Sequence, residues 1–231
     1  MRTPVLALAL TGLVAPLALS VPAHAAPAAA PYDFNGDGRT DLAVGAPDAT
    51  VGGRSKAGAV SVVYGGSAGL KTATRTLITQ NTAGVPGAAE AGDAFGTALA
   101  SADLNKDGYA DLLVGAPGED VGAGAVTLLR GSASGLTTRQ AAWFGQNTAG
   151  VPGTAEKGDR FGARVLLADH SGDRRAELTV AAPGEDAGDG AVWSLRGAAG
   201  GPVTAGALSF GPAATGVGTS GSPRFGTALN G

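Results

Sequence analysis

The fold is decided by residues 95–117, which read FGTALASADLNKDGYADLLVGAP. Within this stretch a Phe-Gly pair, an aspartate-rich turn and a Gly-Ala-Pro tripeptide follow one another. Runs of five to eight residues that favour strands, bounded by Gly, Pro and Asp, are typical of β-strands. We therefore predict strands over Phe95–Ala102 and Asp111–Gly115, joined by the aspartate-rich turn.

These features recur along the chain at a nearly constant spacing. Phe95-Gly96 returns 66 residues later as Phe161-Gly162, and Gly58-Ala59-Val60 returns at the same spacing in residues 124–126 and 190–192. A constant period of this kind indicates repetition of one supersecondary unit. The predicted units cover about residues 31–94, 95–160 and 161–224, and residues 225–231 begin a further one.

Each unit contains enough strand signals for four short strands. In the second unit, residues 124–130 and 140–145 add the third and fourth to the two named above. Four strands in a unit of this size are typical of a β-propeller blade, whereas the coils of a β-solenoid are usually much shorter. We predict an all-β protein of about three four-stranded blades. Because three blades are few for a closed ring, we expect a partial propeller whose open edges permit self-association.

The N-terminal segment has the pattern of a secretory signal peptide. Arg2 precedes an almost unbroken apolar run over residues 5–21, and Ala23-His24-Ala25 forms a small-x-small cleavage site. We predict a signal peptide over residues 1–25, a linker over 26–30 and repeats over 31–231. The protein is then secreted, and no later stretch is apolar enough to span a membrane.

Composition excludes several classes of function. The chain has no cysteine, so disulfides, thiol catalysis and Cys-based zinc sites are ruled out. Beyond the signal peptide, 15 basic and 19 acidic residues are interspersed without a basic stripe, which argues against nucleic acid as a partner. A cysteine-free chain with few aromatic residues needs another source of stability, and bound metal is the obvious one.

Two nine-residue turns carry oxygen side chains at positions one, three, five and nine. If such a turn curls round a cation, the carbonyl of position seven adds a fifth protein ligand, and glycine at position six permits the sharp bend. Carboxylate and amide oxygens suit Ca²⁺ better than Mg²⁺, which demands stricter geometry. The predicted ligands are Asp33, Asn35, Asp37, Arg39 and Asp41 in the first turn, and Asp103, Asn105, Asp107, Tyr109 and Asp111 in the second.

A third turn at the same phase of the repeat is degenerate. Its candidate ligands are Asp169, Ser171, Asp173, Arg175 and Glu177. Serine is a weaker ligand than asparagine, glutamate is longer than aspartate, and Arg174 replaces the glycine of position six. We expect either much weaker calcium binding here or a turn held by an arginine–carboxylate pair. The sequence thus predicts two calcium sites and a degenerate third.

The order Phe-Gly, aspartate-rich turn, Gly-Ala-Pro resembles the FG-GAP repeat of integrin α-subunit propellers and of related bacterial secreted proteins. The resemblance covers nearly everything from about residue 30 onward. It implies a propeller with calcium turns on one rim and with Phe95, Phe161 and Phe225 in the core. The resemblance also implies more blades than the three counted here, because the family forms seven-bladed rings.

No catalytic constellation emerges from the sequence. Residues 65–69 match the G-x-S-x-G nucleophile elbow, but that motif requires a following helix and a histidine base. The one histidine beyond the signal peptide, His170, lies in the third turn, at a position expected to point outward. The pairs Glu119-Asp120 and Glu185-Asp186 suggest glycosidase chemistry, yet their fixed place in the repeat favours a solvated loop.

We therefore expect a non-catalytic extracellular module of binding or adhesion type. Its partner is an extracellular macromolecule or glycan whose identity the sequence does not specify. The alternative is that the chain is the propeller portion of a larger secreted hydrolase of phospholipase or esterase type, since FG-GAP repeats also resemble segments of such enzymes.

Overall fold

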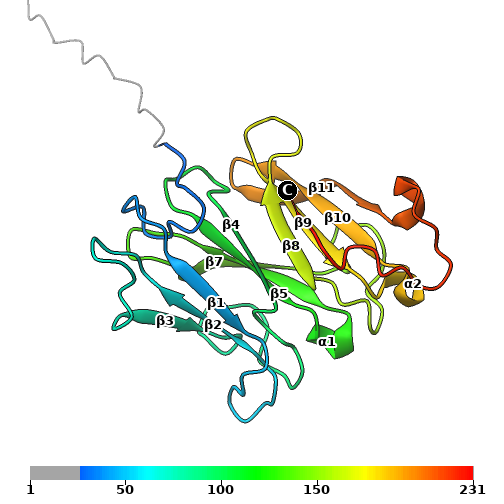
Figure 1. The fold of residues 1–231 in the computed structure, drawn as a ribbon, viewed down its shortest axis with the longest axis horizontal. Coiled ribbons are helices and arrows are strands. Elements are labelled where there is room, and N and C mark those ends of the chain that lie inside the picture. Colours follow the sequence, from blue (N-terminus) through cyan, green and yellow to red (C-terminus); the bar gives the residue numbers. More distant parts are fainter. Residues whose placement is uncertain (1–26, 231) are drawn as a thin grey trace, which may run out of the picture.

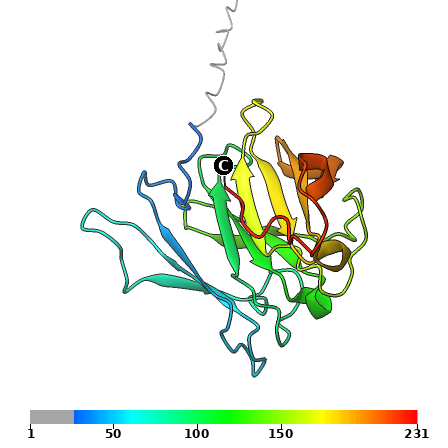
Figure 2. The ribbon, with the colours of Figure 1, turned by 45° about the vertical axis from the view of Figure 1, so that its right-hand side comes forward.

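The computed structural model describes residues 27–230, and the signal peptide predicted over residues 1–25 lies outside them. The described chain forms three antiparallel sheets that follow one another in chain order (Figures 1 and 2). Each sheet is a simple meander, in which strands that are consecutive in the chain are also neighbours in the sheet. The prediction of an all-β protein built from three successive blades is confirmed.

The first sheet has three strands and the other two have four. The first contains β1 (Leu42–Ala46), β2 (Ala59–Val63) and β3 (Arg75–Ile78). The second contains β4 (Ala98–Ala102), β5 (Asp111–Ala116), β6 (Ala125–Arg130) and β7 (Thr137–Phe144). The third contains β8 (Arg164–Ala168), β9 (Glu177–Ala182), β10 (Ala191–Ala198) and β11 (Gly201–Phe210). Three short turns of helical type are α1 (Glu119–Gly122), α2 (Glu185–Gly188) and η1 (Pro212–Thr215).

The first blade departs from the four-strand prediction because, within the described residues, no strand precedes its aspartate-rich turn. Residues 27–30 run against the second blade instead, where the Ala29 N–H donates to the Asp103 carboxylate and the Tyr32 N–H donates to Ser101. Pro27 and Pro31 bracket this segment, and proline has no N–H to donate to a sheet ladder. Strand β1 consequently has one ladder partner, β2, and an alternating pattern of exposure.

The last described residues also lie away from the first blade. The N–H groups of Arg224 and Phe225 donate to the carbonyls of Gly188 and Asp189 in the third blade. Residues 225–230 form turns and coil rather than a strand, so they do not supply the missing strand of the first unit.

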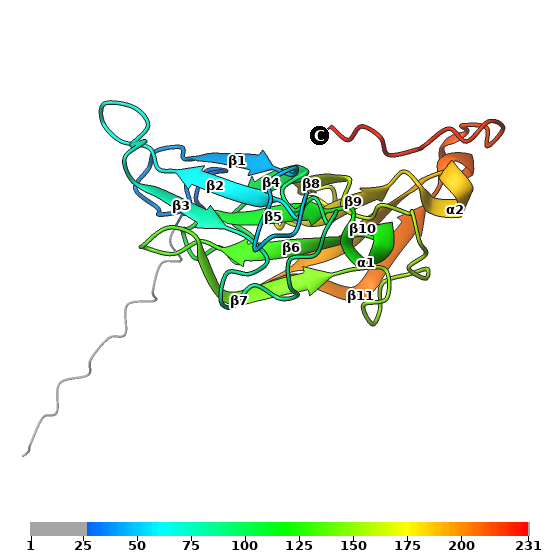
Figure 3. The same ribbon diagram turned by 90° about the horizontal axis from the view of Figure 1, so that it is seen from below.

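The hydrophobic core lies between neighbouring blades. One buried cluster joins the first and second sheets around Phe34, Phe95 and Leu112, and another joins the second and third sheets around Phe161 and Trp193. Strands β4 and β8 lie side by side (Figures 1 and 3). Strands β5 and β9 are buried throughout, as the continuous apolar run after Asp111 predicts for β5.

Glycines bring successive blades unusually close together. The Phe-Gly pair that begins each unit docks on the preceding blade: the Phe95 N–H donates to Ala57 and the Phe161 N–H donates to Ala123, both at 3.0 Å or less. Gly115, from the Gly-Ala-Pro of the second unit, faces Gly162 of the third so closely that a Cβ would overlap the Gly162 carbonyl oxygen. Gly45 faces Gly96 in the same way. The FG and GAP motifs are therefore two halves of one contact between blades.

The first testable consequence concerns Gly115. Its φ lies outside the left-handed region, so the cost of Gly115→Ala is steric overlap with the Gly162 carbonyl rather than backbone strain. Overpacking of a close contact costs about 1–3 kcal/mol, and we expect a loss of that size in the free energy of unfolding measured with urea. Gly218→Ala is the matched control, because nothing lies within 4 Å of a Cβ there. Equal stability of both variants would show that the blades do not depend on this contact.

Candidate metal centre

The three aspartate-rich turns occupy equivalent places in the blades. The first (residues 33–41) leads into β1, the second (103–111) joins β4 to β5, and the third (169–177) joins β8 to β9. Strands, not helices, therefore flank the turns wherever they border regular structure, as the repeat predicted. Because each turn precedes the second strand of its unit, all three lie at the same end of the blades (Figure 1).

The first two turns curl in the same way round their first-position carboxylate. In both, this carboxylate accepts the backbone N–H groups of positions five and six. In the first turn the N–H groups of Asp37 and Gly38 donate to the Asp33 carboxylate at 3.1 and 2.9 Å. In the second turn the N–H groups of Asp107 and Gly108 donate to the Asp103 carboxylate at 3.2 and 3.0 Å. The backbone of both turns is thus held round the first-position carboxylate, whereas the convergence of side-chain oxygens on one cation stays a prediction.

Positions three, five and seven continue the curl. The Asp37 N–H donates to the Asn35 side chain at 3.1 Å, and the Arg39 N–H donates to the Asp37 carboxylate at 3.0 Å. The second turn repeats these contacts with Asn105, Asp107 and Tyr109. Gly38 and Gly108 have φ of 78° and 90°, which confirms the left-handed bend predicted at position six.

The ninth-position carboxylates are buried and differ in their partners. Asp41 accepts the N–H groups of Phe34 at 3.0 Å and Gly65 at 2.8 Å. Asp111 accepts the Gly131 N–H at 3.1 Å and an N–H of the Arg130 guanidinium at 2.8 Å. Sequence reasoning did not anticipate Arg130. The signal that could have found it is its place just before a glycine that recurs in all three units, where the first blade has Tyr64.

Burial controls the protonation of these two side chains. It raises the pKa of Asp41 above its usual value, although the N–H groups of Gly65 and Phe34 favour the charged form. Burial likewise raises the pKa of Asp111 to about 6, against the opposing effect of Arg130. A nearby positive charge favours the ionised form of such a buried carboxyl group and lowers its pKa. Asp111 has such a charge in Arg130 at 2.8 Å, whereas the ion pair of the first turn joins Arg39 to Asp37 at 3.4 Å and not to Asp41.

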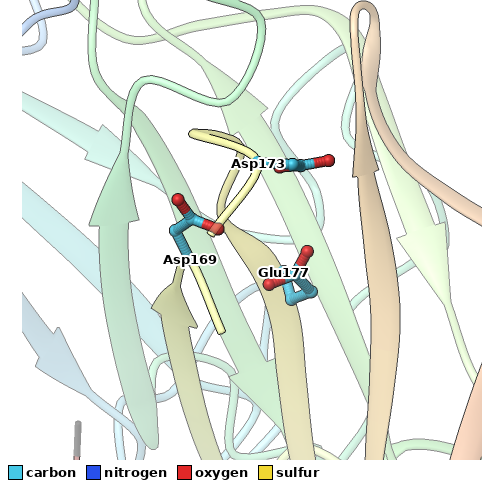
Figure 4. Close-up of side chains that lie close together, drawn as sticks. All are labelled: Asp169, Asp173 and Glu177. Carbon is cyan, nitrogen blue, oxygen red and sulfur yellow. The ribbon is translucent and has the colours of Figure 1, made fainter. Parts of the chain in front are cut away.

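In the third turn the acidic groups come closest together. Ligand oxygens of Asp169, Asp173 and Glu177 all lie within 4.8 Å of one another (Figure 4), the one such acidic trio in residues 27–230. The longer glutamate reaches back into the turn, where it accepts the N–H groups of His170 at 2.7 Å and Ser171 at 3.2 Å. The relative affinity of the three turns for calcium stays a prediction.

The third turn, as the structure describes it, keeps the backbone path of the other two without an arginine–carboxylate pair. Arg174 adopts the left-handed conformation of the glycine it replaces, with φ of 69°, so the backbone path is kept. Within the described chain, neither Arg174 nor Arg175 forms an ion pair, and the turn is held by N–H groups donating to Asp169 and Glu177 instead. His170 is exposed, as expected of an outward-pointing position.

The donor chemistry of the turns fits a hard divalent cation. The side chains at positions one, three, five and nine all offer oxygen, and each turn contributes three carboxylates. In the first turn each carboxylate oxygen that accepts a backbone N–H accepts only one from the described chain and keeps a second lone pair. By contrast, Asp103 Oδ2 and Glu177 Oε2 each accept two N–H groups. The residues of these four positions, with the carbonyl of position seven, are the ones that would hold Ca²⁺. Its contribution would be positive charge shared between carboxylates that otherwise repel one another.

The serine of the G-x-S-x-G match lies in a tight turn, closed by the Gly69 N–H donating to Gly66 at 3.1 Å. No helix follows this serine before β3. The Gly65 N–H of this segment instead holds the Asp41 carboxylate. Separately, no helix within residues 27–230 is long and apolar enough to cross a membrane.

Comparison with known proteins agrees with this geometry. The family model described as FG-GAP repeat matches residues 25–63 and 95–129. Mouse phosphatidylinositol-glycan-specific phospholipase D is 34% identical over 151 residues, which is 65% of this chain and 17% of the phospholipase. Integrin alpha-PS5 of Drosophila melanogaster and human integrin alpha-10 are each 39% identical over 45% and 46% of this chain, and over 9% of their own length.

The chain spans less than a fifth of the length of these curated relatives, so the matches assign it no catalytic residue. What they share with it is the repeat region that forms the blades. The chain therefore carries FG-GAP repeats, and its three sheets are blades of the kind expected in an integrin-α-like β-propeller.

Proposed function

We propose that this chain is a secreted, calcium-binding and non-catalytic module that binds an extracellular macromolecule or glycan, in the manner of an adhesion domain. The observation that carries the proposal is the recurrence of oxygen-rich turns at one phase of the repeat, curled by the same hydrogen bonds. The predicted signal peptide supports secretion. A chain exported to the cell exterior meets abundant calcium, which the turns could bind.

The turns are placed where stiffening them affects more than one blade. The carbonyls of Asp33 and Phe34 accept the N–H groups of Ala110 and Ser132 in the second blade, at 2.9 and 3.1 Å. In the same turn the Asp41 carboxylate ties Phe34 to Gly65 within the first blade. Ordering the first turn therefore orders the junction between two blades, which suits a rigid rim for binding.

A second function is supported by the phospholipase match. The chain is then the propeller portion of a larger secreted hydrolase, and its blades support or orient a catalytic domain. The reading frame beyond residue 231 distinguishes the two: further blades and a stop codon favour the binding module, whereas an attached catalytic domain favours the hydrolase.

Calcium is expected to stabilise the chain through the first two turns. A ligand at one hundred times its dissociation constant stabilises by about 2.7 kcal/mol per site, so the melting temperature should rise with calcium and fall with chelator. Asp37→Asn combined with Asp107→Asn keeps side-chain shape but removes a carboxylate from each turn, and should abolish most of the response. Asp48→Asn, at an exposed site outside the turns, is the control.

Differential scanning calorimetry of the chain from residue 26 onward provides the measurement. If chelator leaves the melting temperature unchanged, or if the double variant responds to calcium as fully as the Asp48→Asn control, then the turns are hydrogen-bonded structures without a metal role.

The contact between Arg130 and Asp111 leads to a separate prediction. A guanidinium on a ligand carboxylate opposes binding of a second cation there, and such coupling is typically about 5–150-fold in affinity. Arg130→Tyr introduces the residue type that the first blade has at this position, and should raise the calcium affinity of the second turn by roughly tenfold. The titration uses an Asp37→Asn background, which weakens the first turn.

Arg139→Gln is the matched control for Arg130→Tyr, because Arg139 is an exposed cation of the same blade that forms no ion pair in the described chain. If Arg130→Tyr and Arg139→Gln both bind calcium with the affinity of the unaltered second turn, then Asp111 is not a ligand.

A further inference from the structure

A small cavity lined by three arginines, the arginine cavity, lies at the end of the third blade away from the aspartate-rich turns. Its volume is about 70 Å³. The lining residues are Arg160, Ala163, Arg164, Pro183, Arg224 and Thr227. Arg164 begins β8, and the third turn follows the other end of that strand. The arginines and the carboxylates of the turn are therefore separated by the length of the blade.

The backbone fixes the starting points of two of these arginines. The Arg160 N–H donates to the Gly122 carbonyl of the second blade, and the Arg224 N–H donates to the Gly188 carbonyl of the third, both at 2.9 Å. Both arginines adopt the left-handed conformation, with φ of 64° and 53°. A residue other than glycine persists in this region when surrounding contacts hold it there. Arg160 and Arg224 thus occupy equivalent, fixed positions just before two successive Phe-Gly pairs.

The repeat itself does not require arginine at these positions. In the preceding unit Ala94 takes the place of Arg160, adopts a φ of 57° and donates its N–H to the Lys56 carbonyl at 3.0 Å. Ala98 takes the place of Arg164 in the same way. Because alanine supports the same backbone path, the arginines need an explanation other than the fold.

The three guanidinium groups have no acidic partner within the part of the chain that the structure describes. Acids at this end of the blade are held by other donors. The Asp159 carboxylate, next to Arg160 in the chain, is buried and accepts the Glu156 N–H at 2.7 Å. The Glu185 carboxylate accepts the Gln146 amide at 2.6 Å. The positive charge around the cavity is therefore available to a ligand.

The cavity combines a buried apolar floor with a charged rim. Ala163 and Pro183 are buried, whereas all three arginines are exposed. Arg164 donates to the Ala163 carbonyl at 2.6 Å, the one side-chain hydrogen bond of these arginines among the described residues. Guanidinium groups present their N–H donors in a planar fork that matches the oxygens of phosphate and sulfate. Since a water molecule takes up about 30 Å³ of liquid, the cavity admits one oxyanion group rather than a sugar ring.

We propose that the arginine cavity binds a sulfate group carried by an extracellular glycan, whose sugar rings stay outside. A sulfate ester has three terminal oxygens, one for each arginine, whereas a carboxylate has two. Beyond the signal peptide 19 acidic residues outweigh 15 basic ones, so the chain as a whole repels a polyanion and needs a local site to hold one. A phosphate ester shares this chemistry and is distinguished by the test. The inference deepens the proposed function, on which it rests in taking the partner to be an extracellular glycan.

The test measures by calorimetry how tightly sulfated dextran binds to the chain from residue 26 onward. Arg160→Ala with Arg164→Ala should weaken binding about tenfold or more, because two charge-assisted contacts are lost. Both changes introduce the residue of the preceding unit, so the fold should be kept. Arg54→Ala with Arg139→Ala is the matched control and should bind like wild type. It removes the same charge from two exposed arginines that form no ion pair in the described chain.

Further measurements separate a fitted site from general attraction between charges. Arg160→Lys with Arg164→Lys keeps the charge but loses the planar fork, and should bind more weakly than wild type. Inorganic sulfate should displace the polymer more effectively than sodium chloride of equal ionic strength. Equal losses in the two alanine pairs, or equal displacement by the two salts, would overturn the proposal. Tighter binding of a phosphorylated dextran would overturn the assignment to sulfate, and binding of inorganic sulfate without the polymer would overturn the assignment to a glycan.

Calcium-dependent melting of the same variants keeps this proposal separable from the proposed function. Arg160→Ala with Arg164→Ala should retain the full calcium response, because these arginines lie away from the turns. If wild type fails to bind sulfated dextran while its melting temperature still rises with calcium, the oxyanion site is wrong and the calcium-binding module stands.

Discussion

The structure depends on the close approach of one backbone to another at each junction between blades. Gly115 and Gly162, like Gly45 and Gly96, meet without side chains between them. This approach buries Phe95 and Phe161 in the core between sheets and allows their backbones to pair with the preceding blade. Phe225, also expected in the core, is only partly buried and packs against Phe210. A chain without cysteine and with few aromatic residues relies on such repeated tight packing, because dispersion contacts are individually weak and count only when many surfaces match.

Much of this could be predicted from the repeat alone. Short strands bounded by Gly, Pro and Asp indicated the sheets, and the continuous apolar run of β5 indicated an interior strand. The curl of the turns also followed from their composition, since glycine at position six permits a bend that places earlier carboxylates over later N–H groups. These are local relations, set by residues within a single turn, and local relations are what a sequence displays most directly.

The features that escaped prediction depend on contacts between distant residues. Arg130, at the end of β6, reaches Asp111 at the start of the neighbouring β5. The recurring glycine after Arg130 marks the position but not this partner. Glu119 looked like one of two solvated acids, but the left-handed backbone of Asp120 and Val121 turns the segment so that only one of the pair faces solvent fully. Within residues 27–230 the opening blade likewise has no first strand, and residues 29 and 32 donate hydrogen bonds to the second blade instead.

Each Phe-Gly pair belongs by sequence to one unit and by contact to the unit before it, so the physical module is offset from the sequence period. A 66-residue segment that runs from one Phe-Gly pair to the next contains one blade. The Phe-Gly pair that packs on this blade belongs to the following segment. Tandem duplication during evolution can therefore lengthen the array at any junction without creating a new kind of interface. Excision of a single blade for engineering, by contrast, should extend past its nominal end to include the next Phe-Gly pair, so that the glycine of its Gly-Ala-Pro stays covered.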